Sequence, residues 1–98
     1  MAGYLLLITY HTKPGCKQMF VDEVSQAGIL SFIQQEEGCR RYQYFFPADQ
    51  DDVILLVEEW ESELHQKNHM KQPHMAELMC LKEKYILEIN LSVIKIAK

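Results

Sequence analysis

The chain has 98 residues, of which 48% are hydrophobic and 24% charged, and its formal net charge is −4. This composition is typical of a globular protein, and the length fits one domain, 1–98. The two arginines, Arg40 and Arg41, and the scattered lysines form no basic stripe. We therefore exclude nucleic acid and a membrane surface as expected partners.

The first expected element is a strand over residues 4–11, which are nearly all apolar and so should be buried on both faces. No basic segment precedes this run, and it is too short to span a bilayer, so we do not interpret it as a signal peptide. The turn signal "KPG" follows at 13–15.

A helix is predicted from Cys16 to about Gln35. Six apolar side chains fall on one helical stripe, namely Cys16, Met19, Phe20, Val24, Ala27 and Leu30. Three others lie off it, namely Ile29, Phe32 and Ile33. Either these three meet a second surface or the helix bends near Gly28. Gly38 is expected to end the helical region.

The second half begins with two strands, 39–46 and 53–60, joined as a hairpin by the turn "PADQDD". Ser62 can cap a short helix over 63–71, and Pro73 suits the first turn of another, so we expect a break near Gln72. The charges around Lys82–Lys84 indicate a solvated helix face. The last strand is 86–96, with Leu87, Ile89, Leu91 and Val93 on one face.

This order, βαββαβ, predicts a ferredoxin-like α+β fold with an antiparallel sheet in the order 4-1-3-2. The first and third strands are continuous apolar runs, as expected of the two central strands. Helices cover only one face of such a sheet, yet these strands offer no polar face. A second copy of the sheet is the simplest cover, so we expect a homodimer of stacked sheets.

Three cysteines, Cys16, Cys39 and Cys80, are odd in number and widely spaced. They match neither a disulfide framework nor a zinc motif. We expect small buried thiols in a reducing, cytoplasmic setting.

The stretch from 36 to 78 resembles the antibiotic biosynthesis monooxygenase family. The matching positions are Glu36/Glu37, Gly38, Cys39 and Tyr42, then Glu58 and Trp60, then His69, Pro73, His74 and Met75. The resemblance implies a dimeric α+β barrel. It also implies a small-molecule substrate of the kind handled by quinol monooxygenases, which use O₂ with no metal or flavin cofactor, or by autoinducer-2 processing proteins.

His69 and His74 are the candidate catalytic residues, as base and anion contact. Histidine suits a base near neutral pH, because its ordinary pKa is about 6.5. The resemblance places their segment beside a pocket between helices and sheet, and the break before Pro73 lets both side chains turn towards one cavity. The alternative is that each is a surface group near a helix end.

A metal site is the lesser alternative, and none is predicted. His65 and His69 share a helix face at i, i+4, and His74 could add a third ligand. However, the family pattern has no histidine at 65, no Glu or Asp lies at an evident spacing to support the ligands, and Lys67 and Lys71 would oppose a cation. His65 is therefore predicted to be a surface residue.

Aromatic side chains are the candidate substrate-binding residues, namely Trp60, Tyr42, Tyr44 and Tyr10. Such rings could hold a flat substrate, and a phenol could hydrogen-bond a developing oxyanion. Each could instead be an ordinary core residue. Glu58, on the Trp60 face of its strand, is predicted to anchor the dimer interface rather than to act as an acid. Its partner would be Arg41 or Arg40 on the neighbouring strand, or a residue of the partner subunit.

The sequence thus leaves two kinds of function open. The first is a cofactor-independent monooxygenase that oxidises a small aromatic or quinol-type substrate with a histidine base. The second is a non-catalytic dimeric module that binds small molecules or is associated with stress. Processing of a sugar-derived signalling molecule lies between them, but it would need a cationic cluster that the sequence does not form as a motif.

Overall fold

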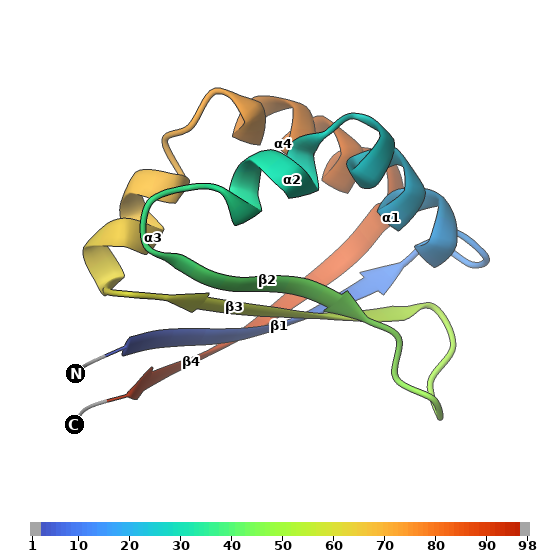
Figure 1. Cartoon of the computed structure of the whole chain (residues 1–98). Helices are drawn as coiled ribbons and strands as arrows, with labels where there is room; N and C mark the ends of the chain where they lie inside the picture. Colours follow the sequence, from blue (N-terminus) through green and yellow to red (C-terminus); the bar gives the residue numbers. More distant parts are fainter. Residues whose placement is uncertain (1–2, 97–98) are drawn as a thin grey trace.

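The computed structural model describes residues 3–96, which form a four-stranded antiparallel sheet with helices over one face (Figure 1). The strands are β1 (Gly3–Thr12), β2 (Cys39–Phe45), β3 (Val53–Trp60) and β4 (Ile86–Ile96). Their order is β2-β3-β1-β4, which confirms the predicted arrangement. The helices are α1 (Lys17–Gln26), α2 (Ile29–Gln34), α3 (Glu63–His69) and α4 (His74–Tyr85). Among residues 3–96, no helix is long and apolar enough to cross a membrane.

The first helical region bends near Gly28, which was one of the two alternatives predicted for it. Gly28 adopts a left-handed conformation (φ 78°), which glycine reaches without steric cost, and it separates α1 from α2. The bend turns Ile29 and Ile33 into the core beside Phe20 and Val24. The single stripe was wrong at Met19, which is 51% exposed, because the region is two helices rather than one.

The second helical region has the predicted break. Ser62 caps α3, since its hydroxyl accepts a hydrogen bond from the backbone N–H of His65 at 3.2 Å. Pro73 directly precedes α4. As a result His69 ends one helix and His74 begins the next, on either side of a short turn.

The face of the sheet beneath the helices carries most of the core. The strand register sets Trp60 beside Tyr4, Glu58 beside Leu6 and Tyr42, and Leu56 beside Ile8 and Tyr44. Fully burying each large apolar side chain here contributes roughly 1.5–3 kcal/mol. Tyr4, Tyr10, Tyr42 and Tyr44 all lie on this side.

The opposite face of β1 and β3 carries no helix of the described chain (Figure 1). It is mostly apolar, with Thr9, His11 and Glu59 as its polar residues. Leu5, Leu7 and Leu55 on it are half-buried. A second apolar surface lies on the helix side of the edge strand β4. Its four side chains are 44–65% exposed, namely Leu87, Ile89, Leu91 and Val93. These surfaces support the expectation of a partner, which stays a prediction.

Candidate active site

Three side chains from different elements meet at one carboxylate. Glu36 lies in the turn after α2, His69 is the last residue of α3, and His74 is the first residue of α4. His69 Nδ1 lies 3.0 and 3.1 Å from the two carboxylate oxygens of Glu36, and His74 Nε2 lies 2.7 Å from Oε2. His69 is buried at 1% exposure, while the Glu36 and His74 side chains are 10% and 17% exposed.

The carboxylate fixes the protonation pattern of both rings. An ionised carboxylate only accepts hydrogen bonds, so His69 Nδ1 and His74 Nε2 must each donate. In a neutral imidazole the other nitrogen then carries the free lone pair. The arrangement therefore presents Nε2 of a fully buried His69 as a proton acceptor. Hydrogen bonds to a charged group each contribute roughly 1.5–3 kcal/mol, which holds the rings in place.

Aromatic rings surround His69. Its imidazole lies 4.7 Å from the Trp60 ring, at an interplanar angle of 32°, and 5.7 Å from the Tyr42 ring. His74 instead stacks on Phe32, with ring centroids 5.8 Å apart. Phe32 is 59% exposed, so His74 lies nearer the surface than His69.

Glu58 lies beneath this group, with 4% exposure. Trp60 Nε1 donates a hydrogen bond to Glu58 Oε1 at 3.0 Å, which meets the requirement that a buried carboxylate be partnered. Burial raises the pKa of Glu58 above its ordinary value, and the bond from Trp60 opposes that rise. The expected bridge to Arg41 or Arg40 is absent from the described residues, where Arg40 pairs with Glu59 at 4.0 Å.

Three tyrosines lie further along the face of the sheet that the helices cover. Tyr10, Tyr42 and Tyr44 contact one another, and burial raises the pKa of each phenol well above its ordinary value. They are therefore neutral hydrogen-bonding groups at ordinary pH. The Tyr44 hydroxyl is buried, and the Tyr42 hydroxyl is its hydrogen-bonding neighbour.

Lys82 departs from the prediction of a solvated helix face. Its side chain turns inward, and Nζ lies 5.5 Å from the centre of the Tyr10 ring. Burial lowers the pKa of this ammonium, against the opposing charge of Glu58. The long aliphatic side chain explains the error. It lets the ammonium reach under the helix from a sequence position whose charged neighbours suggest exposure to solvent. Lys84, two residues on, is exposed and pairs with Glu23 at 3.5 Å.

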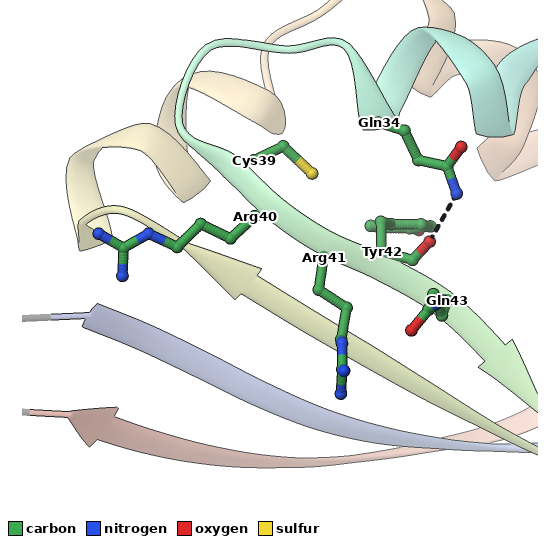
Figure 2. A pocket seen from close by; sticks show the side chains of 6 residues that line it. All are labelled: Gln34, Cys39, Arg40, Arg41, Tyr42 and Gln43. Atoms are coloured by element: carbon green, nitrogen blue, oxygen red, sulfur yellow. Dashed lines mark hydrogen bonds between the residues drawn. The ribbon is translucent and has the colours of Figure 1, made fainter.

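Two pockets open near these residues. One, of about 330 Å³, reaches the histidine group and is lined by Glu36, Glu37, His65, Asn68, His69, Lys71 and Gln72. The other, of about 410 Å³, lies along β2 and is lined by Gln34, Cys39, Arg40, Arg41, Tyr42 and Gln43 (Figure 2). In Figure 2 the Arg40 and Arg41 side chains extend in different directions from the strand, so they do not converge on one anion.

Comparison with known protein families identifies the family of this chain. A model described as antibiotic biosynthesis monooxygenase matches residues 3–79. The chain belongs to that family. The probable quinol monooxygenase YgiN of Escherichia coli (strain K12) is 28% identical over 94 residues, which cover 86% of this chain and 88% of that protein.

Solved structures agree on the fold. A conserved protein from Methanosarcina mazei Go1 has a TM-score of 0.83 at 21% identity, over 96% of this chain and 92% of its own. SnoaB, a cofactor-independent oxygenase from Streptomyces nogalater, has a TM-score of 0.80 at 9% identity, over 100% and 96%. The chain thus has the ferredoxin-like α+β fold of antibiotic biosynthesis monooxygenases.

Within this member of the antibiotic biosynthesis monooxygenase family, the structure brings four of the candidate residues together, and their catalytic and binding roles stay predictions. His69 and His74 share one carboxylate, and Trp60 and Tyr42 contact His69. Tyr10 is buried at 1% exposure, whereas Tyr44 is half-buried. Their roles in binding a substrate stay predictions, as do the interface roles of Glu58 and Arg41. For Glu58, an exposure of 4% leaves little surface to offer a partner.

Glu36 is the residue that sequence reasoning did not assign. It is 33 and 38 residues away from the two histidines, so no local spacing links them. The "EEGC" segment was part of the family pattern, which was the available signal. The predicted surface residue His65 is half-buried instead, with its Nδ1 2.7 Å from the Ser62 hydroxyl.

Proposed function

We propose that this protein is a cofactor-independent monooxygenase that oxidises a small quinol-type aromatic with O₂, and that His69 is the general base. The observation that carries the proposal is the hydrogen bond between Glu36 and His69 Nδ1, which leaves Nε2 of a buried imidazole as the proton acceptor. The relative named as a probable quinol monooxygenase supports the substrate class.

The reaction balances without a further reductant. The base takes a hydroxyl proton, and the quinolate gives electrons to O₂ as a carbon–oxygen bond forms. The resulting peroxide loses water when its O–O bond breaks, so that one quinol and one O₂ yield one hydroxyquinone and one water. Glu36 would stabilise the imidazolium that forms on His69, as a carboxylate does behind other catalytic histidines.

Binding roles follow from position. Trp60 and Tyr42 contact the His69 ring and would border a flat substrate, while His74, nearer the surface, would contact its anion. The 330 Å³ pocket beside Glu36 and His69 is the access route in this proposal. Tyr10 and Tyr44 would hydrogen-bond the far oxygen of the substrate through phenol groups that burial keeps neutral.

The test is oxygen consumption with a panel of quinols and anthrones, with and without chelator, corrected for autoxidation by heat-inactivated protein. We expect activity to survive chelation. His69→Gln, which keeps the size of a buried side chain, should lower the rate by about 10²–10⁴-fold, the usual contribution of a general base. His74→Ala should also lower it, whereas His11→Ala, at a remote histidine, should leave it unchanged.

Activity lost to chelator alone, or unchanged in His69→Gln, would overturn the proposal. Failure of every substrate would favour the second candidate, a non-catalytic module that binds small molecules. One observation favours that candidate. Trp60, Tyr10 and Tyr42 are at most 1% exposed, and neither Trp60 nor Tyr10 lines either of the two pockets described above. Processing of a phosphorylated sugar-derived signal has less support, because Arg40 and Arg41 diverge.

The assembly and setting of the protein belong to the same proposal. Two apolar surfaces, on the open face of the sheet and along β4, support a homodimer. The three cysteines are free, which fits a reducing cytoplasm, but the expectation of buried thiols was wrong for Cys80, which is exposed, while Cys16 and Cys39 are partly buried. Burial and the nearby charges of Glu36 and Glu58 raise the pKa of Cys39 to about 11, so this thiol is not a nucleophile in the proposed reaction.

A further inference from the structure

We infer that Glu36, His69 and His74 form a binding site for a transition-metal dication of the Zn²⁺, Co²⁺ or Ni²⁺ kind. The inference goes beyond the proposed oxygenase and does not depend on it. Among residues 3–96, these three are the one group of histidine and carboxylate side chains with ligand atoms close enough, all within 4.8 Å of one another.

The distances suit a shared ion. Two ligands about 2.1 Å from a metal, at angles between 90° and 109°, lie roughly 3.0–3.4 Å apart. His69 Nδ1 lies 3.0 and 3.1 Å from the oxygens of Glu36, and His74 Nε2 lies 2.7 Å from Oε2. His74 must move to share an ion, because its Nε2 lies too close to Oε2 and because the three ligand atoms, now within 4.8 Å of one another, must all reach this spacing. Each ring would carry its hydrogen on the other nitrogen, a change of tautomer rather than of charge.

The donor set selects the class of ion. Imidazole nitrogen suits Zn²⁺, Co²⁺ and Ni²⁺, whereas Mg²⁺ and Ca²⁺ prefer sites made of oxygen alone. Two neutral imidazoles and one carboxylate leave room in the coordination sphere for water or a small anion. Burial of Glu36 and His69 also protects the site from competing water.

The local charges admit a cation, contrary to the expectation that Lys67 and Lys71 would oppose one. Lys67 is 65% exposed and pairs with Glu63 at 3.7 Å. The pocket leading to the site is lined by two carboxylates, Glu36 and Glu37, and one ammonium, Lys71. The pocket is therefore net negative when the histidines are neutral.

The ligand set differs from the one that histidine spacing suggested. His65 and His69 share a face of α3, but His65 Nδ1 is bonded to Ser62 and its Nε2 lies 3.7 Å from Glu37. The sequence predicted no metal site partly because no Glu or Asp lay at an evident supporting spacing from these histidines. Glu36 supplies that acid from the turn after α2.

Metal binding would change the role of His69. Coordination through Nδ1 moves the ring hydrogen to Nε2, the atom that accepts the proton in the proposed oxygenase. An ion in this site would therefore inhibit a cofactor-independent reaction. Binding and activity thus give separate readouts, and the failure of one leaves the other standing.

The experiment is calorimetric titration of the chelator-treated, full-length protein with Zn²⁺, supported by the absorption spectrum with Co²⁺. We expect one equivalent, and a cobalt spectrum without the charge-transfer band of a thiolate ligand. Glu36→Gln and His74→Ala should each weaken binding by at least about tenfold. Glu37→Gln removes the same charge from the same pocket, and His11→Ala removes a remote histidine, so both should bind as the wild type does.

Two outcomes would overturn the inference. One is a wild-type protein that binds no Zn²⁺ at micromolar concentration. The other is equal weakening by Glu36→Gln and Glu37→Gln, which would mean that pocket charge rather than coordination attracts the ion. Circular dichroism of Glu36→Gln checks that weaker binding does not reflect unfolding, and the His74→Ala result, at a partly exposed side chain, gives a second reading.

Discussion

The Glu36 carboxylate accepts a hydrogen bond from the ring of His69, 33 residues further along the chain, at 3.0 Å. The bond joins the turn after α2 to the end of α3, and it sets which nitrogen of His69 faces away from the acid. This orientation matters for catalysis. A histidine that carries its ring hydrogen on the nitrogen facing the substrate cannot accept a proton there.

Glu36→Gln should therefore impair catalysis more than folding. The amide keeps the size of the carboxylate but can present its N–H₂ to His69 and stabilises an imidazolium less. We expect kcat/KM for an oxidisable quinol to fall by about 10–100-fold, with a smaller change in KM. Glu37→Gln, at a side chain that is 89% exposed, is the matched control. Equal rates for the two variants in the oxygen electrode would remove Glu36 from the mechanism.

Glu58→Gln tests the buried carboxylate under Trp60. Burial raises the pKa of Glu58 in the folded state, so the folded protein holds this proton more tightly than the unfolded chain does. The wild type should therefore lose stability relative to Glu58→Gln as pH rises above about 4.3, the ordinary value for glutamate. Urea unfolding at a series of pH values measures this difference in the free energy of unfolding.

The glutamine can still accept the hydrogen bond from Trp60 Nε1, so the difference should vanish at low pH, where Glu58 is protonated. A difference that grows as pH falls would have the wrong sign. Trp60→Phe gives a second reading, because it leaves Glu58 without its donor and should cost about 1–3 kcal/mol, in addition to the smaller ring.

The sequence predicted those features that depend on neighbours along the chain. The long apolar runs of β1 and β3 marked the central strands, and Ser62 and Pro73 marked the starts of α3 and α4. It could not predict the partner of His69, because the contact with Glu36 depends on how the turn after α2 packs over α3. The inward turn of Lys82 was missed for a related reason. The sequence position of a long side chain does not show where its charged group lies.

Gly38→Ala should destabilise the fold and disturb His65. Gly38 adopts φ 80°, and an added Cβ would collide with the imidazole of His65. The left-handed conformation alone costs a non-glycine residue roughly 1–2 kcal/mol. Gly15→Ala carries the same strain, at φ 75°, but meets open space, so it isolates the conformational term.

We expect Gly38→Ala to lower the free energy of unfolding by at least about 1 kcal/mol more than Gly15→Ala, because the ring must leave the Ser62 hydroxyl that it contacts. Urea denaturation of the two variants measures the difference. Equal losses would indicate that the collision with His65 is relieved at no cost.

Leu7→Lys and Leu91→Lys test the proposed homodimer. Leu7 lies on the open face of β1, and Leu91, 57% exposed, lies in the apolar row of β4. A lysine in a desolvated apolar interface leaves a charge without a partner, so either variant should shift the protein towards monomer. Leu64→Lys, at a leucine on α3 that is 64% exposed, is the control. Sedimentation velocity over a range of concentrations gives the result for all three.

A wild type that is monomeric throughout would refute the dimer. Dissociation by Leu7→Lys alone would place the interface on the stacked sheets, and dissociation by Leu91→Lys alone would place it along the β4 edge.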